Sequence, residues 1–227
     1  MKRLAVVVLV LAALLLVADR VAERVAEGAL AEQLTGELGS RPAVEIGGFP
    51  FLTQAVVGRY DDLRVRAGRV ERSGLSLTDF SAVLTGTQLP LADAARGDVS
   101  SVPVQQLAAS GVLPYAELER LAGTGLSLAA DPQGVRVSGT VRVLGRDVAA
   151  SAVGAVTLQG DRVVVRPRDI EVAGVRATGA VSRALAGRLD LDVRLPTLPY
   201  GVQLTTLRSG PQGLEVSGSA RDVLLRR

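Results

Sequence analysis

Alternation of apolar and polar residues after position 42 restricts the fold of this chain more than any other feature. Leu63, Val65 and Ala67 alternate with Arg64 and Arg66. The same two-residue period occurs at 135–143, 148–158, 189–195, 202–208 and 214–220. Because successive side chains of a strand point to opposite faces of a sheet, this pattern predicts antiparallel strands with one buried face.

Turn sequences separate these segments, and a few stretches break the alternation. The turns are "DPQG" at 131–134, "QGD" at 159–161 and "SGPQG" at 209–213. Residues 101–123 are predicted to be helical because Pro103 and Pro114 suit helix starts. Shorter helices are expected at 53–57 and 182–186. These elements predict a single α+β domain over 19–227, a long curved antiparallel sheet wrapped around helices.

The N-terminal segment has the layout of an export signal or a membrane anchor over residues 1–18. Lys2 and Arg3 precede fifteen uninterrupted apolar residues, Leu4 to Ala18, and Asp19 follows. Fifteen helical residues span about 22 Å, whereas the hydrocarbon core of a bilayer is about 30 Å thick. The length suits a cleaved signal, but Leu16 is a poor residue for cleavage after Ala18, so both interpretations stay open. In either case the folded part is expected outside the cytoplasm.

Residues 19–38 repeat apolar positions at helical spacing, with Val21, Val25, Leu34 and Leu38 between charged faces. The pattern predicts an amphipathic helix of about twenty residues whose apolar stripe must be covered. Its polar face mixes Glu with Arg, whereas a helix lying on a membrane surface favours an excess of Lys and Arg. We therefore expect this helix to pack on the protein's own sheet.

Composition excludes several classes of function. Apart from Lys2 and Arg3, 24 basic residues stand against 23 acidic ones, so the folded part is nearly neutral and does not suit nucleic acid. The chain has no His and no Cys, which excludes a Ser-His-Asp triad and the usual zinc ligands. Asp61 and Asp62 are neighbours in a predicted strand, so their side chains point to opposite faces. We expect no catalytic residues, no metal and no cofactor.

Aromatic residues make up only 3% of the chain, so any cavity must be lined by Val, Leu and Ala. Two of the three phenylalanines, Phe49 and Phe51, flank Pro50. Pro50 fixes its own φ and favours an extended Phe49, which predicts a rigid apolar corner. That corner is either a hydrophobic plug at the start of a short helix or a lip that meets acyl chains or a bilayer.

Four segments carry a family resemblance: "IGGFPFLTQAVVGRYDDLRV" (46–65), "LPYAELERL" (113–121), "VLGRDV" (143–148) and "LPTLPYGVQLTTLRSGPQGLEVSGSARDVLL" (195–225). In this order they resemble the actinobacterial lipomannan elongation factor A family, over essentially the whole exported part. The resemblance implies one barrel of the tubular lipid-binding (BPI-like) type, phospholipid binding, and a role in maturing envelope lipoglycans without catalytic residues. An aliphatic lumen would suit acyl chains, which are held mainly by contact area.

These considerations predict a lipid-binding protein at the outer face of the cytoplasmic membrane, in the periplasm-like envelope space. Its ligand would be a phospholipid or a lipid-linked glycan, and an envelope glycosyltransferase is the candidate protein partner. The expected apolar contacts are Phe49, Phe51, Leu52, Leu198 and Tyr200. Arg64 and Arg66 are candidates for the headgroup phosphate, although both also fit an ordinary solvated strand face.

Two other classes of function stay open at this point. A structural or adaptor protein acting on envelope enzymes would have a solidly packed interior and an apolar patch that meets a protein partner. A hydrolase or transferase without His would rely on Asp and Glu alone, and no acid–base arrangement in the sequence identifies one.

Overall fold

The structure is a computed structural model, and it describes residues 2–72, 74–89, 101–143 and 145–226. Contacts divide the chain into two compact units. Unit 1 comprises Met1–Gly68, Ser81–Ala108 and Ala220–Arg227, and unit 2 comprises Arg69–Phe80 and Ala109–Ser219.

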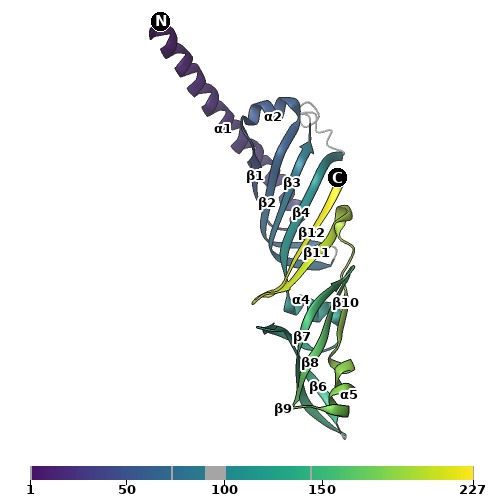
Figure 1. Ribbon diagram of the computed structural model, residues 1–227. Helices are drawn as coiled ribbons and strands as arrows, with labels where there is room; N and C mark the ends of the chain where they lie inside the picture. Colours follow the sequence, from purple (N-terminus) through teal and green to yellow (C-terminus); the bar gives the residue numbers. More distant parts are fainter. Residues whose placement is uncertain (1, 73, 90–100, 144, 227) are drawn as a thin grey trace. The chain divides into compact units, whose positions relative to one another are not determined.

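Two antiparallel sheets, with helices beside them, make up the fold (Figure 1). The first has the order β1 (Ala43–Gly47), β2 (Arg59–Arg72), β3 (Leu75–Gln88), β4 (Ser101–Pro114), β12 (Gly213–Arg226), β11 (Gln203–Ser209). The second has the order β10 (Leu191–Arg194), β8 (Arg162–Val172), β7 (Arg146–Gln159), β6 (Gly134–Val143), β5 (Ser127–Asp131), and β9 (Val175–Arg176) pairs with β8. The helices are α1 (Lys2–Leu38), α2 (Phe51–Val57), α4 (Tyr115–Ala122) and α5 (Gly179–Leu189), with a 3₁₀ turn at Pro199–Gly201.

The α+β class predicted from the alternation is confirmed, as are the strands at 135–143 and 148–158, which pair as β6 and β7. The predicted turns at 131–134, 159–161 and 209–213 join β5 to β6, β7 to β8 and β11 to β12. The expectation of one long sheet is wrong, because the strands divide between two sheets. A period of two fixes the faces of a strand but does not say which strands pair.

The helix predicted over 101–123 is wrong for its first part. Residues 101–114 form β4, and only Tyr115–Ala122 is helical, with Pro114 at its N-cap. The buried residues Val104 and Leu107 stand three positions apart, which imitates helical spacing. Gly86 of the neighbouring strand β3 has a φ of 67°, and a Cβ added to it would lie 2.5 Å from the side-chain oxygen of Gln105 in β4.

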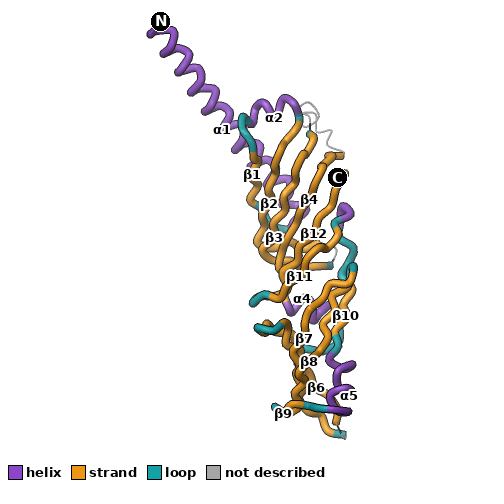
Figure 2. The backbone as a smooth tube through the Cα atoms, viewed as in Figure 1, coloured by secondary structure: helices purple, strands orange, loops and turns teal. Residues whose placement is uncertain are grey.

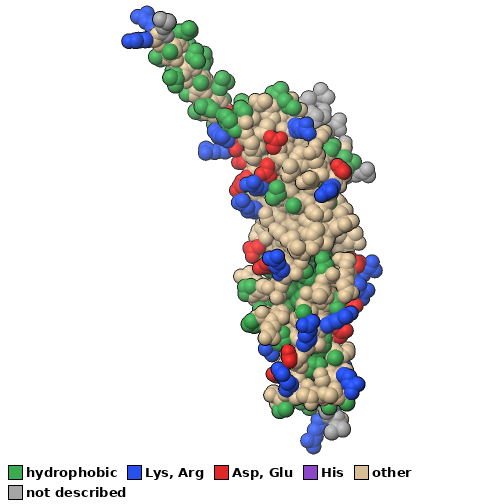
Figure 3. Space-filling model, in the orientation of Figure 1, with side chains coloured by type: hydrophobic (Ala, Val, Ile, Leu, Met, Phe, Trp, Pro, Cys, Tyr) green, Lys and Arg blue, Asp and Glu red, His purple; other side chains and the backbone are tan. Residues whose placement is uncertain are grey.

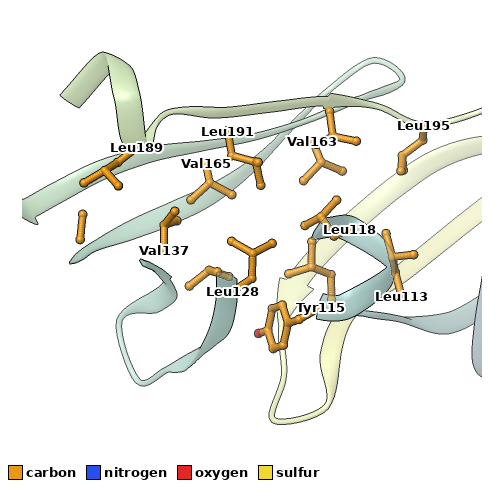
Figure 4. Close-up of a cluster of buried hydrophobic side chains, with 14 of the residues drawn as sticks. Leu113, Tyr115, Leu118, Leu128, Val137, Val163, Val165, Leu189, Leu191 and Leu195 are labelled. Carbon is orange, nitrogen blue, oxygen red and sulfur yellow. The ribbon is translucent and has the colours of Figure 1, made fainter. Parts of the chain in front are cut away.

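Aliphatic side chains fill the interior of unit 2 (Figure 4). Leu118 of α4, Leu189 at the end of α5 and Val165 of β8 are completely buried in one contiguous cluster. The cluster also includes Leu113 and Leu214, from β4 and β12 of the first sheet. These described residues of unit 2 therefore form a packed aliphatic core.

In unit 1 the helix α1 runs without a break from Lys2 to Leu38 (Figure 2). Its C-terminal half contacts β1 and α2, and Ala31 and Leu38 are buried there. The packing of the amphipathic segment on the protein's own sheet is therefore confirmed for its later part, but Val21 and Val25 of the predicted stripe are 55% and 66% exposed. The N-terminal half behaves differently, because every Leu and Val from Leu4 to Val17 is at least 50% exposed.

Candidate functional site

The corner at residues 47–58 positions α2 beside α1. Gly48 has a φ of 96°, and a Cβ at this position would lie 2.5 Å from the side-chain nitrogen Nε2 of Gln54. Any residue other than glycine would therefore displace the Gln54 side chain. The Gln54 side chain donates to the carbonyl of Gly47 (3.2 Å) and accepts from the N–H of Asp61 (3.2 Å). Gly58, with a φ of 71°, ends the helix by donating to the carbonyl of Gln54 (2.8 Å).

Two carboxylates of α1 hold this corner. Asp19 is only 3% exposed, and its carboxylate accepts hydrogen bonds from the N–H groups of Phe51 (3.2 Å) and Leu52 (2.8 Å). Glu27 accepts from the N–H of Ile46 (2.9 Å), on the outer edge of the edge strand β1. The first N–H groups of a helix lack partners within the helix, so Asp19 caps α2 from a different element.

The two faces of α2 have different environments. Phe51 and Ala55, one helical turn apart, are buried against Ile46. On the outer side Phe49 is 56% exposed, Leu52 39%, Val56 77% and Val57 67%. We call these four residues the α2 patch, and green side chains cover this helix in Figure 3. The two phenylalanines of the aromatic corner therefore differ in their environment. Phe51 is buried like a hydrophobic plug, and Phe49 lies at the surface.

The ring of each phenylalanine has one defined contact. The ring of Phe51 lies 6.2 Å from that of Tyr60, centroid to centroid, and burial raises the pKa of the Tyr60 hydroxyl. The guanidinium carbon of Arg20 lies 5.1 Å from the centre of the Phe49 ring, which is cation–π geometry. Arg20, which follows Asp19 in α1, also pairs with Glu23. The α2 patch thus borders a cationic side chain at the end of the apolar run.

The headgroup candidates Arg64 and Arg66 already have acidic partners. Arg64 pairs with Asp62 at 2.6 Å and Arg66 with Glu45 at 2.9 Å, and both guanidinium side chains are about half exposed. Both residues alternate with the inward-facing Leu63 and Val65 in β2. A phosphate would have to displace these carboxylates or share their arginines.

The other two candidates, Leu198 and Tyr200, belong to unit 2. Leu198 is half-buried and packs against the core of that unit. Tyr200 is half-buried and has a φ of 59°, a backbone conformation that non-glycine residues rarely adopt. The structure therefore brings Phe49, Phe51 and Leu52 together around α2 and places Leu198 and Tyr200 in the other compact unit.

Asp19, Val56 and Val57 join the site although sequence reasoning did not select them. Asp19 was the boundary of the apolar run, and its role as a cap depends on a residue 33 positions away. The exposure of the two valines could have been predicted from the sequence, because in "FLTQAVV" apolar residues occur on every side of a seven-residue helix. A helix this short cannot bury all of them, so some must face outward.

Among the described residues no group of three or more Asp or Glu side chains is placed to hold a metal ion. Asp161 pairs with Arg194 and Asp192 with Arg162 at the surface of unit 2. Hydrogen bonds from these arginines hold the pKa of both carboxyl groups below the ordinary value. Such carboxylates stay ionised at neutral pH, whereas a general acid needs a raised pKa.

One helix of the described residues, α1, is long and apolar enough to cross a membrane by its length and composition. A family model described as LmeA-like phospholipid-binding matches residues 17–219. The chain belongs to this family. The match begins at the last residues of the apolar run and ends within β12, so the LmeA-like region includes Asp19, α2, all of unit 2 and most of unit 1. No curated protein and no solved structure is significantly similar to the chain.

Proposed function

We propose that this protein is an exported, membrane-anchored phospholipid-binding protein that holds or presents a lipid at the outer face of the cytoplasmic membrane. Membership of the LmeA-like phospholipid-binding family supports the ligand class. The observation that carries the anchoring is the continuity of α1, whose apolar half is exposed while its other half is built into unit 1. Removal of residues 1–18 would leave Asp19, the cap of α2, as the first residue of a frayed helix end.

The ligand is a phospholipid or a lipid-linked glycan, and residues 19–227 act as one lipid-binding domain. Because the core of unit 2 is packed, we place acyl contacts at surfaces, first at Phe49 and Leu52 and second at Leu198 and Tyr200. Phe51 is buried beneath α2 and holds Phe49 and Leu52 in position without contacting the lipid itself. Arg64 and Arg66 would serve a headgroup only by exchanging their carboxylate partners.

The role of the bound lipid is non-catalytic support of envelope lipoglycan maturation, with an envelope glycosyltransferase as the protein that receives it. The absence of His and Cys from the chain and the Arg-paired, ionised surface carboxylates Asp161 and Asp192 support a holding role over a chemical one. Acyl chains need only apolar contact, at about 0.8 kcal/mol for each buried methylene group.

Lipid retention tests this function. The full chain, purified in detergent and washed until bulk lipid is removed, should release one phospholipid or glycolipid per chain by mass spectrometry. The paired change Phe49→Ser and Leu52→Ser should reduce the retained lipid, because it removes exposed contacts and leaves Phe51 in the core. Val181→Ser, at a similarly exposed valine of α5, is the matched control.

A second variant examines the other candidate set. Tyr200→Gly removes the ring at a position whose positive φ suits glycine, so the backbone conformation there should be retained, and circular dichroism checks the fold of the variant. Loss of lipid in this variant alone would place the ligand at Leu198 and Tyr200. If the washed parent chain retains no lipid and instead cross-links to a glycosyltransferase, the protein is an adaptor and the lipid-binding proposal is wrong.

A further inference from the structure

The α2 patch is an apolar surface without a partner in the part of the chain that the structure describes. Leu52 and Val56 lie one turn apart on α2, about 100° around the helix axis from the buried Phe51 and Ala55, and Phe49 and Val57 flank them in the sequence. Scattered apolar residues are normal on a surface, but three large ones on a helix of seven residues, with Phe49 just before it, mark a contact site. The question is which partner covers them.

The structure ties this surface to the end of the apolar run of α1. Asp19 directly follows that run, and its carboxylate is bonded to the first turn of α2. Arg20, the next residue, lies over the ring of Phe49. Figure 1 shows α2 beside α1 in unit 1, and Figure 3 shows green side chains both along α1 and over α2. Whatever surrounds the end of the apolar run therefore also meets the α2 patch.

The length of the run indicates what this partner is. Leu4 to Ala18 spans about 22 Å, and a bilayer core is about 30 Å thick. A span shorter than the hydrocarbon core is accommodated by local thinning of the bilayer and by the residues that flank the span. Here those residues favour a position of the end of α1 close to the hydrocarbon, because the charge of Asp19 is buried against N–H donors and Val21 and Val25 are exposed on the next turns.

We propose that the α2 patch docks on the lipid bilayer, with Phe49, Leu52, Val56 and Val57 at the boundary of headgroups and acyl chains. Arg20, stacked on Phe49, then lies at the level of the lipid phosphates, where aromatic rings and long cationic side chains are both accommodated. This docking rests on the proposed retention of α1 as an anchor. It adds a second contact that fixes unit 1 against the membrane surface and brings Phe49 and Leu52 to the lipids that the protein binds.

Fluorescence quenching by brominated lipids tests the docking directly. The chain has no Trp, so Val56→Trp introduces a single reporter into the full-length protein. The protein is reconstituted into phosphatidylcholine and phosphatidylglycerol vesicles, with or without lipids brominated near the top of the acyl chain. We expect Trp at 56 to lose about half of its emission or more in the brominated vesicles, as interfacial side chains do.

Two single-Trp controls separate the docking from the anchoring. Val8→Trp lies within the apolar run and reports whether α1 is inserted, and the intact mass of the protein reports whether α1 is still attached. Val181→Trp, in α5 of unit 2, gives the background for an exposed side chain. Quenching at 8 with only background quenching at 56 would overturn the docking and leave the anchor standing. No quenching at 8, or loss of α1, would remove the anchor and the docking with it.

A further comparison examines whether the apolar character of the patch is responsible. Leu52→Glu with Val57→Glu, added to the Val56→Trp protein, should reduce quenching at 56 to background while quenching at 8 is unchanged in the matched Val8→Trp protein. Unchanged amide exchange at Phe51 and Ala55 would verify that α2 stays folded. Undiminished quenching in the Glu variant would overturn the proposal. So would blue-shifted emission at 56 that brominated lipid does not quench, because a protein or a second copy then covers the patch.

Discussion

The N–H of Leu52 donates a 2.8 Å hydrogen bond to the carboxylate of Asp19, across 33 positions of the chain. Asp19 is the first charged residue after the apolar run of α1, and Leu52 is in the first turn of α2. A second bond, from Phe51 to the same carboxylate, completes the cap. The connection makes the end of the apolar run part of the folded structure of unit 1.

Asp19→Ala should loosen α2. Loss of a capping carboxylate that leaves two N–H groups without partners costs about 1–2 kcal/mol, which corresponds to roughly ten-fold faster opening. Hydrogen–deuterium exchange of the α2 amides in detergent measures this. Glu32 is an exposed carboxylate of α1, the helix that also contains Asp19, and Glu32→Ala should leave the exchange of the α2 amides unchanged. Equal protection in the parent and in Asp19→Ala would show that the cap contributes nothing.

The two phenylalanines should differ sharply in their effect on stability. Phe51→Ala removes a buried ring that packs on Tyr60 and Ile46, so it should cost about 3–5 kcal/mol. Phe49→Ala removes a largely exposed ring and should cost less than about 1 kcal/mol. Urea unfolding followed by circular dichroism compares them. Similar losses for both variants would contradict the division into plug and surface residue.

Glu117 should make unit 2 sensitive to acid. It accepts hydrogen bonds from the Arg120 side chain and the Ser76 N–H, and these bonds hold its pKa below the ordinary value of 4.5. A lowered folded-state pKa gives stability that is present above the unfolded-state pKa and is lost as the pH falls through the folded value. We expect urea stability to decline below about pH 4.5, and Glu117→Gln to reduce that decline.

Glu32→Gln, an exposed residue of α1, is the control for this pH dependence. The Glu117→Gln protein should also be less stable at pH 7, because the Arg120 and Ser76 donors lose a charged acceptor. An acid profile identical to that of the parent would remove Glu117 from the account of acid sensitivity.

Gly213 should not tolerate a side chain. A Cβ there would lie 2.2 Å from the carbonyl oxygen of Leu113, so Gly213→Ala forces β12 away from β4 and should cost about 1–3 kcal/mol. Gly187, in α5, has a helical backbone, and a Cβ added there would meet no atom within 4 Å beyond its chain neighbours and the backbone of its own helix. Gly187→Ala should therefore be neutral or stabilise the protein by up to about 1 kcal/mol. Thermal unfolding of the Gly213→Ala and Gly187→Ala variants compares the two effects. Equal melting temperatures would contradict the close approach of Gly213 to the carbonyl of Leu113.

Periodicity and turn chemistry in the sequence were sufficient to predict the class of fold and much of its local structure. Strands β6 and β7, their flanking turns and the short helix expected at 53–57, which begins at Phe51 in the structure, follow from patterns within a few residues of each other. The apolar run from Leu4 to Ala18 likewise indicated a membrane segment or signal without any structure. Local patterns work here because backbone preference and the alternation of side chains are properties of neighbouring residues.

Tertiary structure alone decided three other features: the division of the strands into two sheets, the extended conformation of 101–114, and the separate fates of Phe49 and Phe51. The pairing of a strand depends on distant partners, and β4 is a strand because β3 and β12 lie on either side of it. The contact of Asp19 with Leu52 is of the same kind. Its geometry exists only once α1 packs on β1, because no short-range pattern encodes a hydrogen bond between residues so far apart in the chain.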